Sequence, residues 1–460
     1  MYKIEFNQPI HVHFIGIGGI SMSGLAEILL QEGFTVSGSD SKESDITSLL
    51  KNLGATIRIG QQAENITEDI DLIVYTAAIH PDNPEYKAAL ASGKPILTRA
   101  QLLGQIMSNY KYSVAVSGTH GKTTTTSMLS HVFLAAQADP TISIGGMLDA
   151  ISGNIRVGRS QYFVTEACEY TNSFHAFSPW ISIILNVDAD HLDFFSGIDE
   201  IIQSFRTFAR KLPDNGTLVI NGEMDCLPII IEDLNCNICT FGLSENCKYS
   251  ATDIKYDALG CASYMLKIDN KPVTRITLHV NGIHNVVNSL AAIATADTLH
   301  MEMADIRQGL EDFGGTRRRF EMKGVANGVT IVDDYAHHPT EIQATLSAAK
   351  RMEHNELWCV FQPHTYTRTK ALLPEFAEAL HLADHIVLTK IYAAREKDTG
   401  MVSSQNIAEL LENKYHADVI YLPTFQEAED YLKKNCKKND LLITMGAGDV
   451  VNIGENLLKK

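Results

Sequence analysis

The sequence lacks any long apolar run. None reaches the ~18 residues that a membrane-spanning helix requires. The opening residues, Met1-Tyr-Lys-Ile-Glu-Phe-Asn, also lack the apolar core of a signal peptide. These two absences predict a cytoplasmic protein that does not insert into a membrane.

Basic residues are fewer than acidic residues. The chain carries 38 Lys and Arg against 55 Asp and Glu, a formal net charge of -17. This balance argues against a general surface for nucleic acid or for anionic lipid. A phosphate-bearing ligand must therefore be held by local groups, such as glycine loops, helix ends and individually placed cations.

Cysteine is sparse, with 8 residues in 460. Cys236 and Cys239, with Cys226 and Cys247 nearby, have a spacing that a zinc site could use. We favour free thiols, because the flanking residues are typical of short strands with a turn at Gly242. The length predicts about three domains of ~100–200 residues each.

The segment around which the chain is organised is residues 117–125, Ser-Gly-Thr-His-Gly-Lys-Thr-Thr-Thr. A mostly apolar strand is expected before it, over 112–116, and a helix after it, over 124–136. Strand, glycine turn, Gly-Lys-Thr and helix form the layout of a phosphate-binding loop. Lys122 would neutralise the terminal phosphates, and the Thr123 hydroxyl would hold a magnesium ion. Val116 replaces the usual first glycine, so the loop is shortened, and an ordinary strand-to-helix turn is the alternative.

A second glycine turn lies near the start. An apolar strand over 12–15 leads into Gly16-Ile-Gly-Gly-Ile-Ser21, and a second strand over 35–40 ends in Asp40. This is close to the dinucleotide fingerprint, which places a pyrophosphate at a helix N-terminus. It does not distinguish NAD from a sugar nucleotide, and a βα unit without a ligand is the alternative. Thr76 and Ala77 follow the strand over 71–75 and are candidates for another wall of the same site.

The middle of the chain places acids and a histidine after buried strands. Glu166 ends the strand over 162–166, where magnesium–nucleotide sites use a carboxylate. The strand over 181–185 runs into Asn186-Val-Asp188-Ala-Asp190-His191-Leu-Asp193, which should face a cleft. Glu166 and His191 could converge on one metal site. A hydrogen-bonded loop histidine, with acids that cap the helix over 199–210, is the alternative.

The last third alternates strands and helices, which predicts a second doubly wound sheet. Before it, Asn285 and Asn288 share one helical face and could bind a purine edge or simply cap the helix. Residues 314–316 could form a hinge, and the arginines at 317–319 could clamp phosphates or face solvent. Polar runs follow the strands that end near 334 and 361, where α/β enzymes place ligands.

These motifs together resemble the Mur ligase family. The residues that carry the resemblance are Gly118-Thr-His-Gly-Lys-Thr123, Glu166, Asp190-His191, His284-Asn285, Asn288, Arg319-Phe320 and Asp334. Three runs, residues 16–24, 333–340 and 362–369, are similar to the alanine-adding branch of the family. The peptide-recycling branch is expected to share the first two and to lack the third. Arg206 stands where other members carry a carbamylated lysine, so no carbamate is expected.

The resemblance implies an α/β fold of three domains. They are an N-terminal Rossmann-like domain (1–108) for a UDP-sugar, a central P-loop mononucleotide-binding α/β domain (109–316) for ATP, and a C-terminal Rossmann-like domain (317–460). It implies an ATP- and Mg²⁺-dependent ligase that joins L-alanine to UDP-N-acetylmuramate through an acyl phosphate, in peptidoglycan precursor synthesis. The protein would be a monomer or a homodimer.

The resemblance also assigns roles to residues. Lys122, Glu166 and His191 would be catalytic, and Thr123, Glu166 and His191 would hold metal. The residues expected to bind ATP are Gly118, Thr119, His120, Gly121, Lys122, Thr123, Thr124, His284, Asn285, Asn288, Arg319 and Asp334. The residues expected to bind substrate are Gly16, Gly18, Gly19, Ser21, Asp40, Thr76, Ala77, Tyr335, His337, His338, His364 and Arg368, of which Arg368 would hold the alanine carboxylate.

Three other functions are compatible with parts of the pattern. A peptide-recycling ligase would use the same sugar nucleotide. A nicotinamide-dependent oxidoreductase would use the glycine turn and Asp40 but would leave Lys122 unexplained. A non-catalytic nucleotide sensor would bind ATP without turnover.

Overall fold

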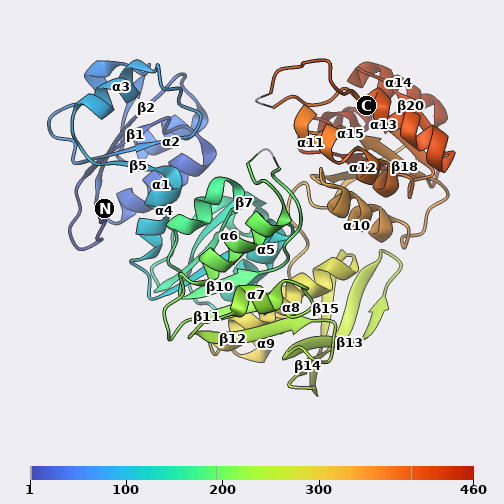
Figure 1. Cartoon of the computed structure of the whole chain (residues 1–460), viewed down its shortest axis with the longest axis horizontal. Coiled ribbons are helices and arrows are strands. Elements are labelled where there is room, and N and C mark those ends of the chain that lie inside the picture. The colour runs from blue at the N-terminus through green and yellow to red at the C-terminus, as the bar shows by residue number, and fades with distance from the viewer. Residues whose placement is uncertain (1–2, 193, 395, 460) are drawn as a thin grey trace.

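The computed structural model describes residues 3–192, 194–394 and 396–459. It contains three β-sheets in chain order, each with its own helices, and the first and third lie on either side of the central one (Figure 1). The expected three-domain α/β architecture is confirmed.

The first sheet has five parallel strands in the order β3-β2-β1-β4-β5. The connections run outward in one direction from β1 and in the other direction from β4. Open parallel sheets bind ligands at the point between two such strands. The strands are β1 (His11–Ile15), β2 (Thr35–Asp40), β3 (Thr56–Ile59), β4 (Leu72–Tyr75) and β5 (Ile96–Thr98). The helices are α1 (Ile20–Gln31), α2 (Asp45–Asn52), α3 (Pro84–Ala91) and α4 (Arg99–Met107).

The central sheet has ten strands in the order β15-β14-β13-β12-β11-β10-β6-β9-β7-β8. Its parallel middle carries the site, and antiparallel pairs close both edges. The strands are β6 (Tyr112–Ser117), β7 (Thr141–Leu148), β8 (Gly153–Arg156), β9 (Tyr162–Glu166), β10 (Ile181–Ile184), β11 (Thr217–Asn221), β12 (Asn237–Gly242), β13 (Tyr249–Tyr256), β14 (Cys261–Ile268) and β15 (Lys271–Asn281). The helices are α5 (Lys122–Ala135), α6 (Ile198–Ala209), α7 (Leu227–Ile231), α8 (Ile283–Thr298) and α9 (Met303–Glu311), with a short helical segment η3 (Tyr170–Ala176).

The third sheet has six strands in the order β16-β17-β21-β18-β19-β20, all parallel except β16. The strands are β16 (Glu321–Ala326), β17 (Val329–Asp334), β18 (Leu357–Phe361), β19 (His385–Leu388), β20 (Asp418–Tyr421) and β21 (Leu441–Met445). The helices are α10 (Pro339–Ala349), α11 (Tyr366–Ala371), α12 (Leu373–Leu380), α13 (Ser404–Leu410), α14 (Phe425–Asn435) and α15 (Val451–Leu458).

The first two domains share a hydrophobic core. One buried cluster joins Leu25 of α1 and Leu102 of α4 to Phe163 of β9 and Phe205 of α6. The third domain has clusters of its own, built around β17, β18 and β21. The first and central domains are therefore joined by apolar packing, and the third is held by polar contacts described below.

Two expectations from composition can be checked. All eight cysteines are free thiols, and no group of three His, Cys, Asp or Glu side chains is arranged for a metal among the described residues. The cysteines therefore form no disulfides, and the preference for free thiols over a zinc site stays a prediction. None of the helices in the described ranges is long and apolar enough to cross a bilayer.

The close packing of α4 on η3 gives a first prediction. A Cβ at Gly104 would lie 2.1 Å from the Ala176 carbonyl oxygen. Helix propensity alone would favour Gly104→Ala by about 0.8–1 kcal/mol. We expect the collision to outweigh this and to lower the free energy of unfolding by about 1–3 kcal/mol, measured by chemical denaturation. Gly197→Ala, where a Cβ would meet no atom within 4 Å, is the control; equal stability of the two variants would contradict the packing.

Candidate active site

The phosphate loop turns sharply between β6 and α5. Gly118 and Gly121 have φ of +141° and +84°, which side-chain-bearing residues rarely adopt. A Cβ at Gly121 would also lie 2.8 Å from Asn288 Oδ1, and one at Gly118 would lie 2.9 Å from Leu185 Cβ. Both glycines are thus required by backbone shape and by close packing, and α8 is brought against the loop.

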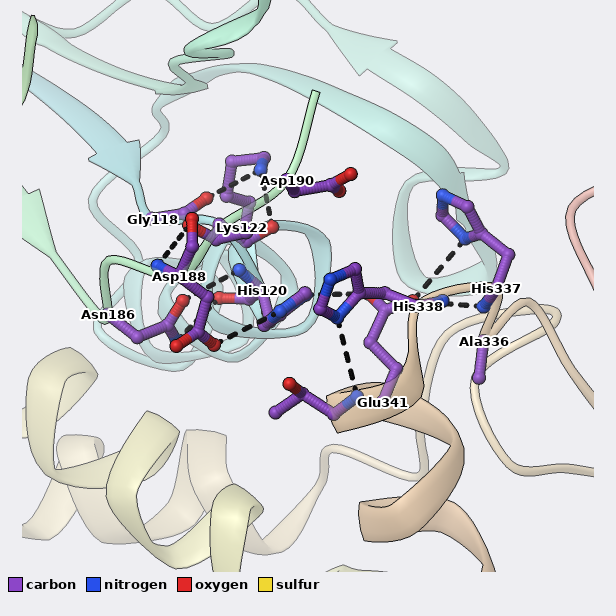
Figure 2. A network of polar contacts seen from close by, with 12 residues as sticks. Gly118, His120, Lys122, Asn186, Asp188, Asp190, Ala336, His337, His338 and Glu341 are labelled. Carbon is purple, nitrogen blue, oxygen red and sulfur yellow. Dashed lines mark hydrogen bonds and ion pairs between the residues drawn. The ribbon is translucent and has the colours of Figure 1, made fainter. Parts of the chain in front are cut away.

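The segment after β10 fastens this loop. The Asn186 side chain accepts from His120 N at 2.7 Å and donates to His120 O at 3.0 Å. Thr119 Oγ1 accepts from Asp188 N at 2.9 Å. Residues 186–191 therefore form one unit with the phosphate loop (Figure 2). Asn186 was assigned no role from sequence, although its place beside the acids of that run was a signal.

Lys122 begins α5 and folds back over its own loop. Its Nζ donates to the carbonyl oxygens of Gly118 at 2.5 Å and Thr119 at 3.0 Å. It also contacts both carboxylate oxygens of Glu169, at 2.9 and 3.1 Å. Glu169 is only 2% exposed and was missed from sequence. Its position three residues after Glu166, just beyond the end of β9, could have indicated it.

Thr123 and Glu166 meet as the metal hypothesis requires. Thr123 Oγ1 donates to Glu166 Oε2 at 3.1 Å, and Gly145 N donates to Glu166 Oε1 at 2.6 Å. A hydroxyl and a carboxylate are oxygen ligands of the kind that Mg²⁺ prefers, usually completed by phosphate oxygens and water. The pair fits such an ion, and its role stays a prediction.

His191 adopts a left-handed conformation, with φ of +55°. Its Nε2 lies 3.5 Å from Glu169 Oε1 and 3.8 Å from Asp190 Oδ2, and the Tyr170 ring lies 4.6 Å from the imidazole centre. His191 thus approaches Lys122 through their shared partner Glu169. Asp193, the last acid of this run, lies outside the described residues.

The third domain reaches the phosphate loop through polar side chains. His120 contacts Asp188 Oδ2 and, across the domain boundary, Glu341 Oε1, each at 3.2 Å. His338 Nε2 lies 3.2 Å from the Ala189 carbonyl oxygen. Glu341, in the first turn of α10, was not singled out from sequence, and its place in that helix's capping box was the available signal.

Arg368 has a partner in the central domain. Its Nε and terminal nitrogen donate to Asp190 Oδ1 at 3.2 and 2.8 Å. Such charge-assisted pairs are stronger than neutral hydrogen bonds. The described contacts therefore tie Arg368 to the loop of His191, and its predicted role toward the alanine carboxylate stays a prediction.

The arginines at 317–319 do not all face solvent. Arg317 is exposed, and Arg318 pairs with Asp333 at 3.1 Å. The Arg318 and Arg319 guanidinium carbons each lie 4.9 Å from the centre of the Tyr335 ring. Asp334, by contrast, accepts from the backbone N–H groups of Phe320 and Ala336 at 2.7 Å, and burial raises its pKa to about 6.

The amides of α8 are largely committed to one another. Asn285 donates to the Asn281 carbonyl oxygen at 2.7 Å, and Asn288 donates to Asn285 Oδ1 at 3.1 Å. Asn288 lies beside the phosphate loop at Gly121, whereas His284 is exposed. Because α8 starts at Ile283, both amides lie inside the helix rather than before it.

A cavity of about 1410 Å³ lies between the first and central domains. Gly19 and Ser21 of the glycine turn and Thr76 and Ala77 after β4 line it, as expected. None of its described lining residues is Asp or Glu, although the chain is strongly acidic. Its charged lining residues are Lys3, Arg99 and Lys211.

Asp40 lies beneath the glycine turn. Its Oδ2 accepts from Gly18 N at 2.9 Å, and a Cβ at Gly16 would lie 2.6 Å from Thr76 Cγ2. The acid at the end of β2 thus holds the turn in shape, and its contact with substrate stays a prediction.

A second cavity, of about 500 Å³, lies between the central and third domains. His191, His337, His364 and Arg368 are among its lining residues. Burial lowers the pKa of His337 and His364 to about 4, so both are neutral at pH 7. Tyr170 lines this cavity and the larger one, so the two spaces meet at that residue.

Arg206 lies away from this region. On α6 it pairs with Glu232 and lies 4.0 Å from Asp233. These ion pairs occupy the Arg206 guanidinium, and the absence of a carbamate here stays a prediction.

The fold and the site define a three-domain α/β enzyme with a phosphate loop in its central domain. Three family models match in the expected order: "Mur ligase family, catalytic domain" over 11–111, "Mur ligase middle domain" over 116–296 and "Mur ligase, glutamate ligase domain" over 318–448. The chain belongs to the Mur ligase family.

Relatives of known name are similar over their full lengths. The UDP-N-acetylmuramate–L-alanine ligase of Lachnospira eligens is 58% identical over 461 residues, with 100% of each chain covered. The enzyme of that name from Caldanaerobacter subterraneus is 50% identical, with 100% of this chain and 99% of the relative covered.

Solved structures are similar as well. The crystal structure of UDP-N-acetylmuramate-alanine ligase from Thermotoga maritima has a TM-score of 0.79 at 30% identity, with 98% of each chain covered. A murein peptide ligase from Psychrobacter arcticus has a TM-score of 0.70 at 25% identity, also with 98% of each chain covered.

The ion pairs of His120 give a prediction about pH. Burial alone would lower the pKa of His120, but the hydrogen bonds that its ring donates to Asp188 and Glu341 outweigh it and raise the pKa to about 9. The stabilisation is complete below the ordinary pKa of about 6.5 and is lost as the pH rises through about 9. Between pH 7 and 9.5, the thermal midpoint should fall by about 2–6 °C more than in His120→Gln, measured by calorimetry. Parallel curves for the two proteins would contradict the assignment.

Proposed function

We propose that this protein is an ATP-dependent ligase that joins L-alanine to the lactyl carboxylate of UDP-N-acetylmuramate, in peptidoglycan precursor synthesis. One geometric observation carries the proposal. The segment 168–170 borders the large cavity through Cys168 and Tyr170, holds the phosphate-loop lysine through Glu169, and borders the second cavity through Tyr170. Three ligands bound at these places would meet at this segment.

The large cavity suits a UDP-sugar. Its charged lining residues are cationic, which favours a pyrophosphate. The N-terminus of α1 also lies at this cavity. No side chain caps the helix there, since the N-cap residue is Gly19, so backbone N–H groups remain for an anion. The cavity extends to Tyr170. A UDP-sugar that filled it would therefore have its lactyl carboxylate directed toward His191.

The phosphate loop suits ATP with magnesium. Thr123 and Glu166 would hold the ion, with His191 near the substrate carboxylate, and the ion would neutralise charge on the transferred phosphoryl group. Lys122 would bind the terminal phosphates. These cations are needed because a carboxylate has to approach a triphosphate.

The reaction would proceed in two steps. The lactyl carboxylate attacks the γ-phosphate of ATP, which yields an acyl phosphate and ADP. The amine of L-alanine then attacks the acyl carbon, inorganic phosphate leaves, and the amine loses a proton. Acyl phosphates hydrolyse readily, so the contacts of His338 and Arg368 with the loop of His191 would help to exclude water.

The other functions are less well supported. Relatives named as alanine ligases are 50–58% identical, whereas the solved peptide ligase from Psychrobacter arcticus is 25% identical. For an oxidoreductase, the acid after β2 would have to bind a ribose, and Asp40 is instead bonded to Gly18 N. A nucleotide sensor would have no use for two cavities that meet beside the phosphate loop.

The choice of amino acid can be tested directly. Phosphate release should require ATP, UDP-N-acetylmuramate and L-alanine together. A peptide-recycling ligase would release phosphate with L-alanyl-D-glutamyl peptides and not with L-alanine. Binding of ATP without turnover under every combination would support a sensor and contradict the proposal.

Removal of the phosphate-loop cation separates the two nucleotide sites. Lys122→Ala should lower the rate of phosphate release by about 10²–10³-fold, because the transferred phosphoryl group loses its fixed cation. Binding of UDP-N-acetylmuramate, measured by calorimetry, should be unchanged, since Lys122 does not line the large cavity. Loss of both properties in a folded variant would contradict separate sites.

A further inference from the structure

Lys122 has no donor left for a phosphate in this structure. An ammonium group has three N–H donors. Its Nζ contacts the carbonyl oxygens of Gly118 and Thr119 and the carboxylate of Glu169. A triphosphate that enters the loop must therefore displace at least one of these partners.

Glu169 is the partner whose charge opposes the nucleotide. It is 2% exposed, and both of its carboxylate oxygens contact the Lys122 ammonium group, at 2.9 and 3.1 Å. A buried carboxylate beside a phosphate-binding lysine repels an incoming anion and competes for the same cation. For ATP binding alone, this acid is unfavourable.

Glu169 has a second neighbour that explains its presence. Its Oε1 lies 3.5 Å from His191 Nε2, and the Tyr170 ring lies 4.6 Å from the imidazole centre on another side. A carboxylate that accepts the N–H of one ring nitrogen fixes the tautomer and orientation of a histidine and leaves the other nitrogen unprotonated. Glu169 can do this for His191 once Lys122 no longer occupies it.

We infer that Glu169 is a positioning residue that exchanges partners: it holds Lys122 while the site is empty and orients His191 after the triphosphate has taken Lys122. This inference rests on the proposed function, because it assigns His191 to the reaction. It couples the arrival of the nucleotide to the alignment of the histidine through one side chain.

The test is Glu169→Gln, which keeps the shape and removes the charge. ATP should bind about fivefold more tightly in EDTA, because a competing and repelling charge is gone. The kcat for phosphate release should fall by about 10–100-fold, because His191 loses its oriented partner. Affinity and turnover therefore move in opposite directions, which a merely structural role would not produce.

Controls make each outcome decisive. Glu311→Gln, at an exposed position of α9, should change neither quantity. Glu169→Asp keeps the charge on a shorter side chain, so it should retain wild-type ATP affinity in EDTA and lose turnover. Weaker ATP binding by Glu169→Gln, or unchanged turnover, overturns the inference. If Glu169→Gln does not fold, Glu169→Asp decides the question. The inference holds if that variant keeps wild-type ATP affinity in EDTA and loses turnover, and it is overturned by any other result.

The proposed function and the role of Glu169 can fail separately. If the wild-type protein does not ligate alanine, the proposed function is wrong. The affinity for ATP in EDTA would still show whether Glu169 competes for Lys122. If the wild type ligates alanine and the variant's affinity and turnover move together, only the inference about Glu169 is wrong.

Discussion

An acidic protein can hold several anions at once only where its own carboxylates are excluded or neutralised. This chain, with a net charge of -17, does both. The described lining of the large cavity contains no acid, whereas three described acids around the phosphate loop each have a partner. Glu169 faces Lys122, Glu166 faces Thr123, and Asp190 faces Arg368.

The interfaces of the central domain differ in kind. Apolar side chains form a continuous core with the first domain, so these two parts should behave as one body. The contacts with the third domain described above are hydrogen bonds and ion pairs, made by His120, His338 and Arg368. Polar interfaces of this kind permit relative domain motion more readily than apolar ones. The third domain is therefore the part expected to open and close over bound ligands.

Local chemistry made much of the fold readable from sequence. The turn at Gly118 and Gly121 could be placed because few other residues tolerate that backbone. The helix start of α5 was misplaced by two residues, since Lys122 and Thr123 have no strong local signal for either state.

Pairings between distant side chains could not be read in this way. Glu341 lies 221 residues from His120, and Glu169 lies 47 residues from Lys122, and no periodic pattern connects them. Asp40 was identified as a site residue, but its bond to Gly18 depends on the register of the loop over the strand. Such contacts are consequences of three-dimensional packing, which periodicity does not encode.

The position of Tyr170 at the junction of both cavities has a consequence for chemical intervention. A compound confined to either chamber would compete with a single reactant, whose cellular concentration could overcome it. A molecule that reached from one cavity to the other beside Tyr170 would block two reactants together. Inhibitor design against this enzyme would then begin with linkers that span the two cavities at Tyr170.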